Sequence, residues 1–79
     1  MARYFFDTDD GTQIFRDEAG VEFVNADAAT KFAITRMCEV AKELPADGVE
    51  RFVWTKVRDE AGIFLFVAEM TFKSLWPKV

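Results

Sequence analysis

Histidine is absent from this chain of 79 residues, and cysteine occurs once, at Cys38. The lack of histidine excludes Ser-His and Cys-His nucleophiles, and it also excludes every metal site that needs an imidazole ligand. A single cysteine excludes an intrachain disulfide and a cysteine-rich zinc site, which favours a reducing compartment. We therefore expect a cytoplasmic protein.

Long apolar segments are also absent. The longest uncharged apolar run, residues 61–68, is far too short to span a bilayer, and Asp7 follows the first residues too closely for a secretory signal. The net charge of −4 and the pI near 4.7 argue against broad attraction to nucleic acid or anionic membranes, because both need a basic surface. We expect no membrane association, and binding to nucleic acid is the minor alternative.

Apolar residues make up 51% of the chain, and nine residues are Phe. A chain of this length cannot divide into two cores, so residues 1–79 are predicted to form one small domain. The core of so small a domain gives modest stability, which an oligomer contact would increase.

Residues 59–72 are the most hydrophobic stretch and predict a central β-strand. The alternate residues Phe64, Phe66, Ala68, Met70 and Phe72 point one way. The intervening residues Ile63, Leu65 and Val67 are apolar too, so both faces of this strand need cover.

Further strands are predicted at residues 2–7, 12–16 and 50–59, and a brief pairing at residues 21–24. The Asp-rich turn at residues 8–11 ends in Gly11, which can take positive φ, so it predicts a hairpin. A helix is expected from the N-cap Asn25 to about Leu44, where Pro45 stops it.

The helix is amphipathic, and the buried part of its first half is all alanine, which allows close approach to a sheet. Its apolar stripe consists of Ala26, Ala29, Ala33, Met37, Val40, Ala41 and Leu44. Together these elements predict an α+β fold of ββαββ order, in which one helix packs on one face of a four-stranded, mostly antiparallel sheet.

The sequence Arg-Asp-Glu-Ala-Gly occurs twice, at residues 16–20 and 58–62. A type I turn that ends in a left-handed glycine is typical of a hairpin with a bulge. We interpret the repeat as two uses of the same turn chemistry, and a duplicated ββ unit is the alternative.

Acidic residues gather near the first turn, where Asp7, Asp9, Asp10 and Glu18 resemble a set of calcium ligands. The register of an EF-hand loop fails, because Gly11 and Thr12 take the places of an oxygen ligand and of the invariant glycine. Adjacent acids in turns are normally solvated. We predict turns here, and no metal, cofactor or catalytic residue; the chain is expected not to be an enzyme.

Two surface features have alternative interpretations. The mixture of Arg3, Tyr4, Arg51, Trp54, Lys56 and Arg58 resembles sheets that stack single-stranded bases. The acidic charge and the core's need for aromatics make this the minor interpretation. Phe32 lies off the helix stripe, where cover for Arg36 by cation–π packing is favoured over a contact with a partner.

The chain resembles a group of short bacterial proteins of unknown function, found mainly in soil-dwelling proteobacteria. The resemblance rests on Arg3-Tyr4-Phe5-Phe6-Asp7, Asp10-Gly11, Arg16-Asp17 with Gly20, Ala28-Ala29, and Val57-Arg58-Asp59-Glu60 with Gly62. It implies a compact cytoplasmic domain and no activity. A weaker similarity, in the hairpin and the alanine-bearing helix, is to small antitoxin domains of the HicB type, which implies partner binding.

The Phe64/Phe66/Met70/Phe72 side of the strand is expected to meet the helix, joined by Phe52 and Trp54. One helix cannot cover both faces of the sheet, so we predict an interaction surface on the second face, for a homodimer or a protein partner. Its candidate residues are Val53, Val57, Ile63, Leu65, Val67 and Trp76. The alternative is that Leu75 and Trp76 fold back to cover this face.

Overall fold

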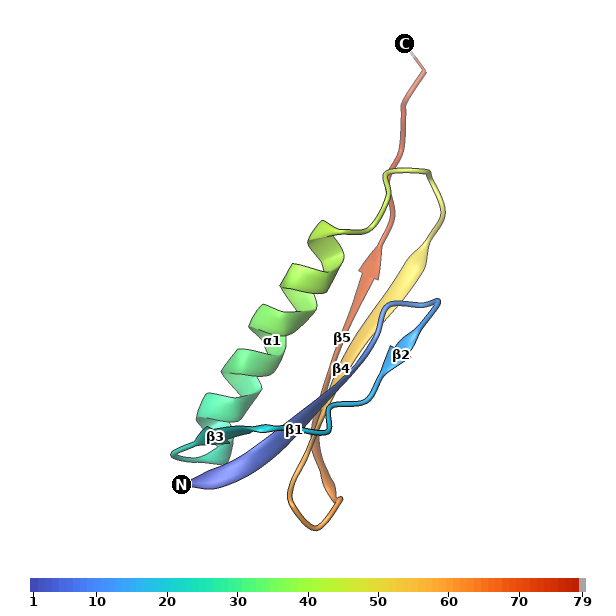
Figure 1. Ribbon diagram of the computed structural model, residues 1–79. Helices are drawn as coiled ribbons and strands as arrows, with labels where there is room; N and C mark the ends of the chain where they lie inside the picture. Colours follow the sequence, from blue (N-terminus) through green and yellow to red (C-terminus); the bar gives the residue numbers. More distant parts are fainter. Residues whose placement is uncertain (79) are drawn as a thin grey trace.

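The computed structural model describes residues 1–78 of the chain. Its elements follow in the order β1 (Ala2–Asp9), β2 (Ile14–Phe15), β3 (Val21–Phe23), α1 (Ala26–Lys42), β4 (Arg51–Arg58) and β5 (Phe64–Phe72). All strand pairings are antiparallel, and α1 lies along one side of the sheet (Figure 1). The predicted α+β class is therefore confirmed, with β2 and β3 as two short pieces where one strand and a brief pairing were expected.

The sheet has the strand order β2-β1-β4-β5, and β3 pairs with residues 2–4 of β1. The prediction that residues 59–72 form a central strand is wrong, because β5 starts at Phe64 and lies at an edge of the sheet. High hydrophobicity on both sides of a strand is typical of a central position. Here part of that apolar surface stays exposed instead.

The helix begins at the expected cap and ends at Lys42, two residues before the predicted Leu44. The Asn25 side chain accepts a hydrogen bond from the Ala28 amide at 2.9 Å, and Asp27 supplies a negative charge to the first turn. Lys42 lies in the last turn, where a cation is favourable. Within the predicted stripe Ala29, Ala33 and Met37 are buried, which confirms the face that meets the sheet.

The core has two parts between the helix and the sheet. Towards the start of α1, the small Ala29 and Ala33 meet the large Tyr4 and Phe6 of β1, so small residues face large ones as expected. Towards its end, Met37 packs with Val53 of β4 and Ala68 of β5, and with further residues that are partly buried: Val40, Leu44, Phe66 and Met70.

The two faces of β4 are reversed relative to the prediction. Val53 and Val57 are 0% and 1% exposed beneath the helix, whereas Phe52 is 45% exposed and Trp54 pairs with Glu69 on the other face. Both sets of side chains are apolar, so the alternation by itself does not say which set faces inward. The strand register assigns the inner set, because Val57 pairs with Phe6 and Val53 pairs with Met70, and both partners pack in the core.

Phe64 was also expected under the helix, but it lies on the opposite face and is 53% exposed. A register shift between Val57 and Arg58 explains this, because Arg58 pairs with Phe64 while Val57 pairs with Phe66. The extra residue, Leu65, makes a β-bulge that turns Phe64 away from the helix.

The two Arg-Asp-Glu-Ala-Gly segments share local chemistry but build different connections. In each, the aspartate Oδ1 accepts two backbone N–H bonds and the final glycine has positive φ, +72° at Gly20 and +84° at Gly62. Residues 58–62 form the expected hairpin. Residues 16–20 do not reverse the chain, because β2 and β3 both run antiparallel to β1.

Beyond β5 the chain continues away from the sheet (Figure 1). Leu75 and Trp76 are 73% and 82% exposed, and the Trp76 indole donates to the Ala46 carbonyl at 3.4 Å. The alternative in which they fold back over the sheet is therefore wrong. Within residues 1–78, α1 falls short of the length and apolarity needed to cross a membrane.

Candidate functional site

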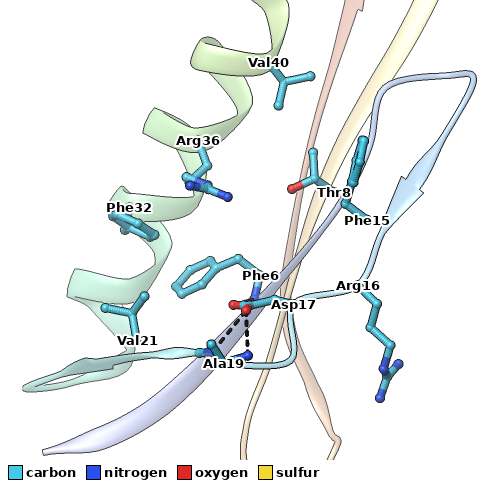
Figure 2. A pocket seen from close by; sticks show the side chains of 11 residues that line it. Phe6, Thr8, Phe15, Arg16, Asp17, Ala19, Val21, Phe32, Arg36 and Val40 are labelled. Carbon is cyan, nitrogen blue, oxygen red and sulfur yellow. Dashed lines mark hydrogen bonds between the residues drawn. The ribbon is translucent and has the colours of Figure 1, made fainter.

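One groove lies between α1 and β1 and has a volume of about 380 Å³ (Figure 2). Phe32, Arg36 and Val40 of the helix line one wall, and Phe6 and Thr8 of β1 line the other. The segment after β2 closes the groove, and its Asp17 points inward while Arg16 points outward.

The carboxylate of Asp17 is fully committed to backbone donors. Its Oδ2 accepts from the Phe6 amide at 3.1 Å, and its Oδ1 accepts from the amides of Ala19 and Gly20 at 3.1 and 3.0 Å. Burial by itself would raise the pKa of Asp17, but these donors and nearby Arg36 lower the pKa below its ordinary value. The Asp17 carboxylate accepts the hydrogen bond of the Phe6 amide, which a neighbouring strand would otherwise accept. Because both of its oxygens accept backbone hydrogen bonds, Asp17 is a poor candidate for proton transfer.

Phe32 packs in this region as part of the core. Its ring centroid lies 4.9 Å from that of Phe6 and 5.2 Å from that of Phe23, and the Arg36 guanidinium carbon lies 6.0 Å from its ring centroid. The favoured interpretation of Phe32, cover for Arg36 by cation–π packing, is confirmed.

A buried ion pair lies on the other face of the sheet. Arg58 Nε is 2.8 Å from Asp7 Oδ2, and Arg58 also donates to the Asp17 backbone carbonyl. The Phe5 ring covers the guanidinium, whose carbon is 4.7 Å from the ring centroid. Hydrogen bonding to Asp7 raises the pKa of Arg58 further, so its charge is fixed. This cluster joins β1, β4 and the segment after β2.

Within residues 1–78, no second layer of helix or sheet packs on the sheet face opposite α1, although Arg58 on this face is buried beneath Phe5. Directly opposed residues of antiparallel strands share a face, so the register defines this set. We call it the open face: Phe5, Asp7, Asp9, Phe52, Trp54, Lys56, Arg58, Phe64, Val67, Glu69 and Thr71. Trp54 donates to the Glu69 carboxylate, and Lys56 Nζ lies 5.8 Å from the centroid of the Phe64 ring.

A hollow of about 290 Å³ on the open face has Asp7, Asp9, Trp54 and Lys56 among its lining residues. Asp7 Oδ1 accepts from the Asp17 amide and Asp9 Oδ1 accepts from the Gly11 amide. Both carboxylates are thus engaged in holding the backbone, and the geometry presents no free acid and base pair at this hollow.

The acidic turn is held by its own side chains. Asp10 Oδ1 accepts from the amides of Thr12 and Gln13 at 2.9 and 2.7 Å. These donors lower the pKa of Asp10 below its ordinary value. The predicted turn at residues 8–11 is confirmed.

The basic residues that suggested nucleic-acid binding do not form one surface. Tyr4 is buried under the helix, Arg3 pairs with Glu22, and Arg51 makes a two-pronged pair with Asp47. Hydrogen bonding from Arg51 lowers the pKa of Asp47 strongly. On the open face Lys56 and Arg58 lie beside Asp7, Asp9 and Glu69, so acids balance the cations.

Of the six predicted interaction residues, Val53 and Val57 lie in the core and are corrected above. The other four are exposed: Ile63 60%, Leu65 47%, Val67 51% and Trp76 82%. They all lie on β5 or on the segments that flank it. We call β5 and the residues 73–78 that follow it the β5 side.

The predicted interaction surface did not include three residues of the β5 side. Glu69 lies on β5 and Lys73 directly follows it, with opposite charges four positions apart, and Leu75 is 73% exposed. The spacing of this charge pair is visible in the sequence, but a central strand has no free edge at which the pair could act.

Three comparisons with known proteins complete the description. The sequence model of one family, described as DUF6894, a domain of unknown function, matches residues 3–71. No curated protein and no solved structure matches the chain.

Proposed function

The chain belongs to the DUF6894 family, whose function is unknown, and we propose from its own geometry that it is a non-enzymatic protein-interaction module. Its binding surface is the β5 side. The observation that carries the proposal is the gathering of exposed apolar residues on this one edge of the sheet.

Exposure supports this choice. Leu65, Val67 and Leu75 present aliphatic side chains to solvent at 47%, 51% and 73% exposure. Singly exposed apolar residues are ordinary, but a line of them along one strand and its extension marks a contact surface. Covering them would remove apolar area from water, which stabilises a complex by roughly 25 cal/mol per Å² before the entropic costs of association.

The backbone supports it as well. β5 is nine residues long and has β4 as its neighbour on one side alone among the described strands. A long edge strand presents a row of unpaired N–H and C=O groups, which can add a strand from another chain.

The remaining chemistry supports a role in binding over one in catalysis. Asp7 and Asp17 hold the backbone, and the sequence has no histidine. We also propose that the module works in the cytoplasm, where the exposed Cys38 would remain a free thiol.

The test compares two double variants with the native chain. Val67→Lys with Leu75→Ser changes the β5 side, and Ile34→Lys with Val24→Ser changes exposed apolar residues elsewhere. We expect the native chain and the Ile34→Lys with Val24→Ser variant to form a stoichiometric complex, either a homo-oligomer or a complex with another purified polypeptide. The Val67→Lys with Leu75→Ser variant should not form this complex. Native mass spectrometry reads out the stoichiometry.

Two results would overturn the proposal. One is a native chain that stays monomeric at high micromolar concentration and rebinds no purified polypeptide. The other is a complex that survives Val67→Lys with Leu75→Ser unchanged, since the surface would then lie elsewhere.

A further inference from the structure

The segment after β5 does not pair with the outer edge of β5, which has β4 as its neighbour on the other side alone among the described strands. Gly48 N donates to Ser74 Oγ at 3.1 Å and the Trp76 indole donates to the Ala46 carbonyl, so this segment lies against the loop that precedes β4. The chain then runs on past the sheet (Figure 1). Because β5 ends at Phe72, a pairing that includes residues 73–75 extends the strand by three residues.

The sequence of this edge is complementary to itself when it is reversed. Glu69 and Thr71 alternate on β5 and lie on the open face, and Lys73 is the first residue after β5. An extended conformation through Lys73 would place its side chain on the same face. Glu69 and Lys73 lie roughly 13 Å apart along one strand, at about 3.3 Å per residue, too far to pair with each other. Within residues 1–78, Lys73 makes no ion pair, and Glu69 accepts from the Trp54 indole through Oε2.

We propose that the β5 side pairs antiparallel with the β5 side of a second copy of this chain, around a two-fold axis at Thr71. Glu69 then lies opposite the partner's Lys73, and Lys73 lies opposite the partner's Glu69. The same contact occurs twice, as an isologous interface requires. This inference rests on the proposed function and names its partner.

The same register also explains the exposed aliphatic residues. In this register, two residues lie opposite each other when they are equally far from Thr71 on either side. Val67 and the partner's Leu75 are each four positions from Thr71, so they meet on the open face. These side chains are 51% and 73% exposed in the single chain, and each would cover the other. The dimer joins the two sheets into one continuous antiparallel sheet and removes one edge of each.

The test exchanges charges. Glu69→Lys puts two lysines opposite each other at both ends of the interface, and Lys73→Glu puts two glutamates there. Each variant alone should dimerise at least tenfold more weakly than the native chain. An equimolar mixture should regain dimers, because the mixed dimer has an opposite-charge pair at both ends. Sedimentation equilibrium measures the dissociation constants.

The matched controls carry the same charge changes on the exposed part of α1, as Glu39→Lys, Lys42→Glu and their mixture. These should dimerise like the native chain. Because Glu69→Lys also removes the bond to the Trp54 indole, Glu69→Gln is a second variant that retains an acceptor there. It should weaken the dimer less than Glu69→Lys does.

The outcomes separate this inference from the proposed function. Dimers that persist in both single variants, or that are lost without recovery in the mixture, would overturn the register while self-association stands. A monomeric native chain that binds another purified polypeptide through the β5 side would overturn the inference alone. If Glu69→Lys fails to fold, Leu75→Ser decides, since it should weaken the dimer and leave the fold of the single chain intact.

Discussion

At the residue scale, the Arg58 side chain connects three segments of the backbone. Its side chain pairs with Asp7, donates to the Asp17 carbonyl and is covered by Phe5. Asp7 and Arg58 are 51 positions apart, and neither lies in a pattern that marks it as buried. The sequence groups Arg58 with the other basic residues, because charged residues are seldom buried unless they are paired. The strand register between β1 and β4 brings its partner Asp7 close, and a single sequence does not show this register.

Loss of the Arg58 side chain should destabilise the fold strongly. Arg58→Ala leaves the Asp7 carboxylate buried without its cation, which should lower the free energy of unfolding by about 3–5 kcal/mol. Arg51→Ala breaks a more exposed pair and should cost much less. Urea titration followed by circular dichroism measures both. Equal losses would show that the Arg58 pair is no more important than the surface one.

Asp17 should contribute stability that depends on pH. Its pKa in the folded chain is lowered below 3.8, so its contribution is present above this ordinary value and is lost as pH falls through the lowered pKa. Asp17→Asn loses an acceptor for the Phe6, Ala19 or Gly20 amide, at about 1–3 kcal/mol. The difference in unfolding free energy between the native chain and Asp17→Asn should be steady from pH 7 to 5 and shrink below pH 4.

The exposed substitution Glu39→Gln serves as the control for that titration. The unfolding free energy of Glu39→Gln should follow that of the native chain at every pH of the titration. A gap between native and Asp17→Asn proteins that stays constant down to pH 2 would rule out the lowered pKa as its cause.

At the scale of elements, the sequence was informative where the local chemistry is self-contained. Asn25 marked the start of the helix, and the alanine stripe identified its buried face. The faces of β4 could not be assigned, because Val53 and Trp54 both suit a core by hydrophobicity alone. The register of β4 with β1 and β5 decides between them, and that register is set by tertiary structure. The edge position of β5 was hidden for a related reason, since an apolar strand suits either a sheet centre or an interface.

The two glycine turns offer a prediction at this scale. A Cβ at Gly20 would lie 2.8 Å from Arg3 Cγ and 2.9 Å from Phe5 Cε1, whereas nothing lies within 4 Å of one at Gly62. Both glycines have positive φ, so alanine at either costs about 1 kcal/mol or more in backbone strain. Gly20→Ala should therefore lower the melting temperature further than Gly62→Ala. Thermal unfolding by calorimetry measures the order, and the reverse order would contradict the tight packing at Gly20.

At the scale of the whole molecule, the chain is elongated, with extents of 54 × 20 × 16 Å, and its cations are dispersed among acids. Binding to single-stranded nucleic acid needs a basic track beside exposed aromatic rings. The open face supplies rings at Phe52 and Phe64. Its two cations lie beside Asp7, Asp9 and Glu69, and the net charge is −4.

We therefore expect no binding to a labelled single-stranded oligothymidine at low salt, measured by fluorescence anisotropy. Low salt is the strict condition, because release of counterions makes any such binding strongest there. Binding that falls steeply with added salt and disappears in Lys56→Ala would contradict this, since Lys56 is the exposed cation of the open face. Arg58→Ala is unsuitable for this purpose, because its expected loss of stability would imitate a loss of binding. A negative result with a folded chain would remove single-stranded nucleic acid as a ligand of the open face.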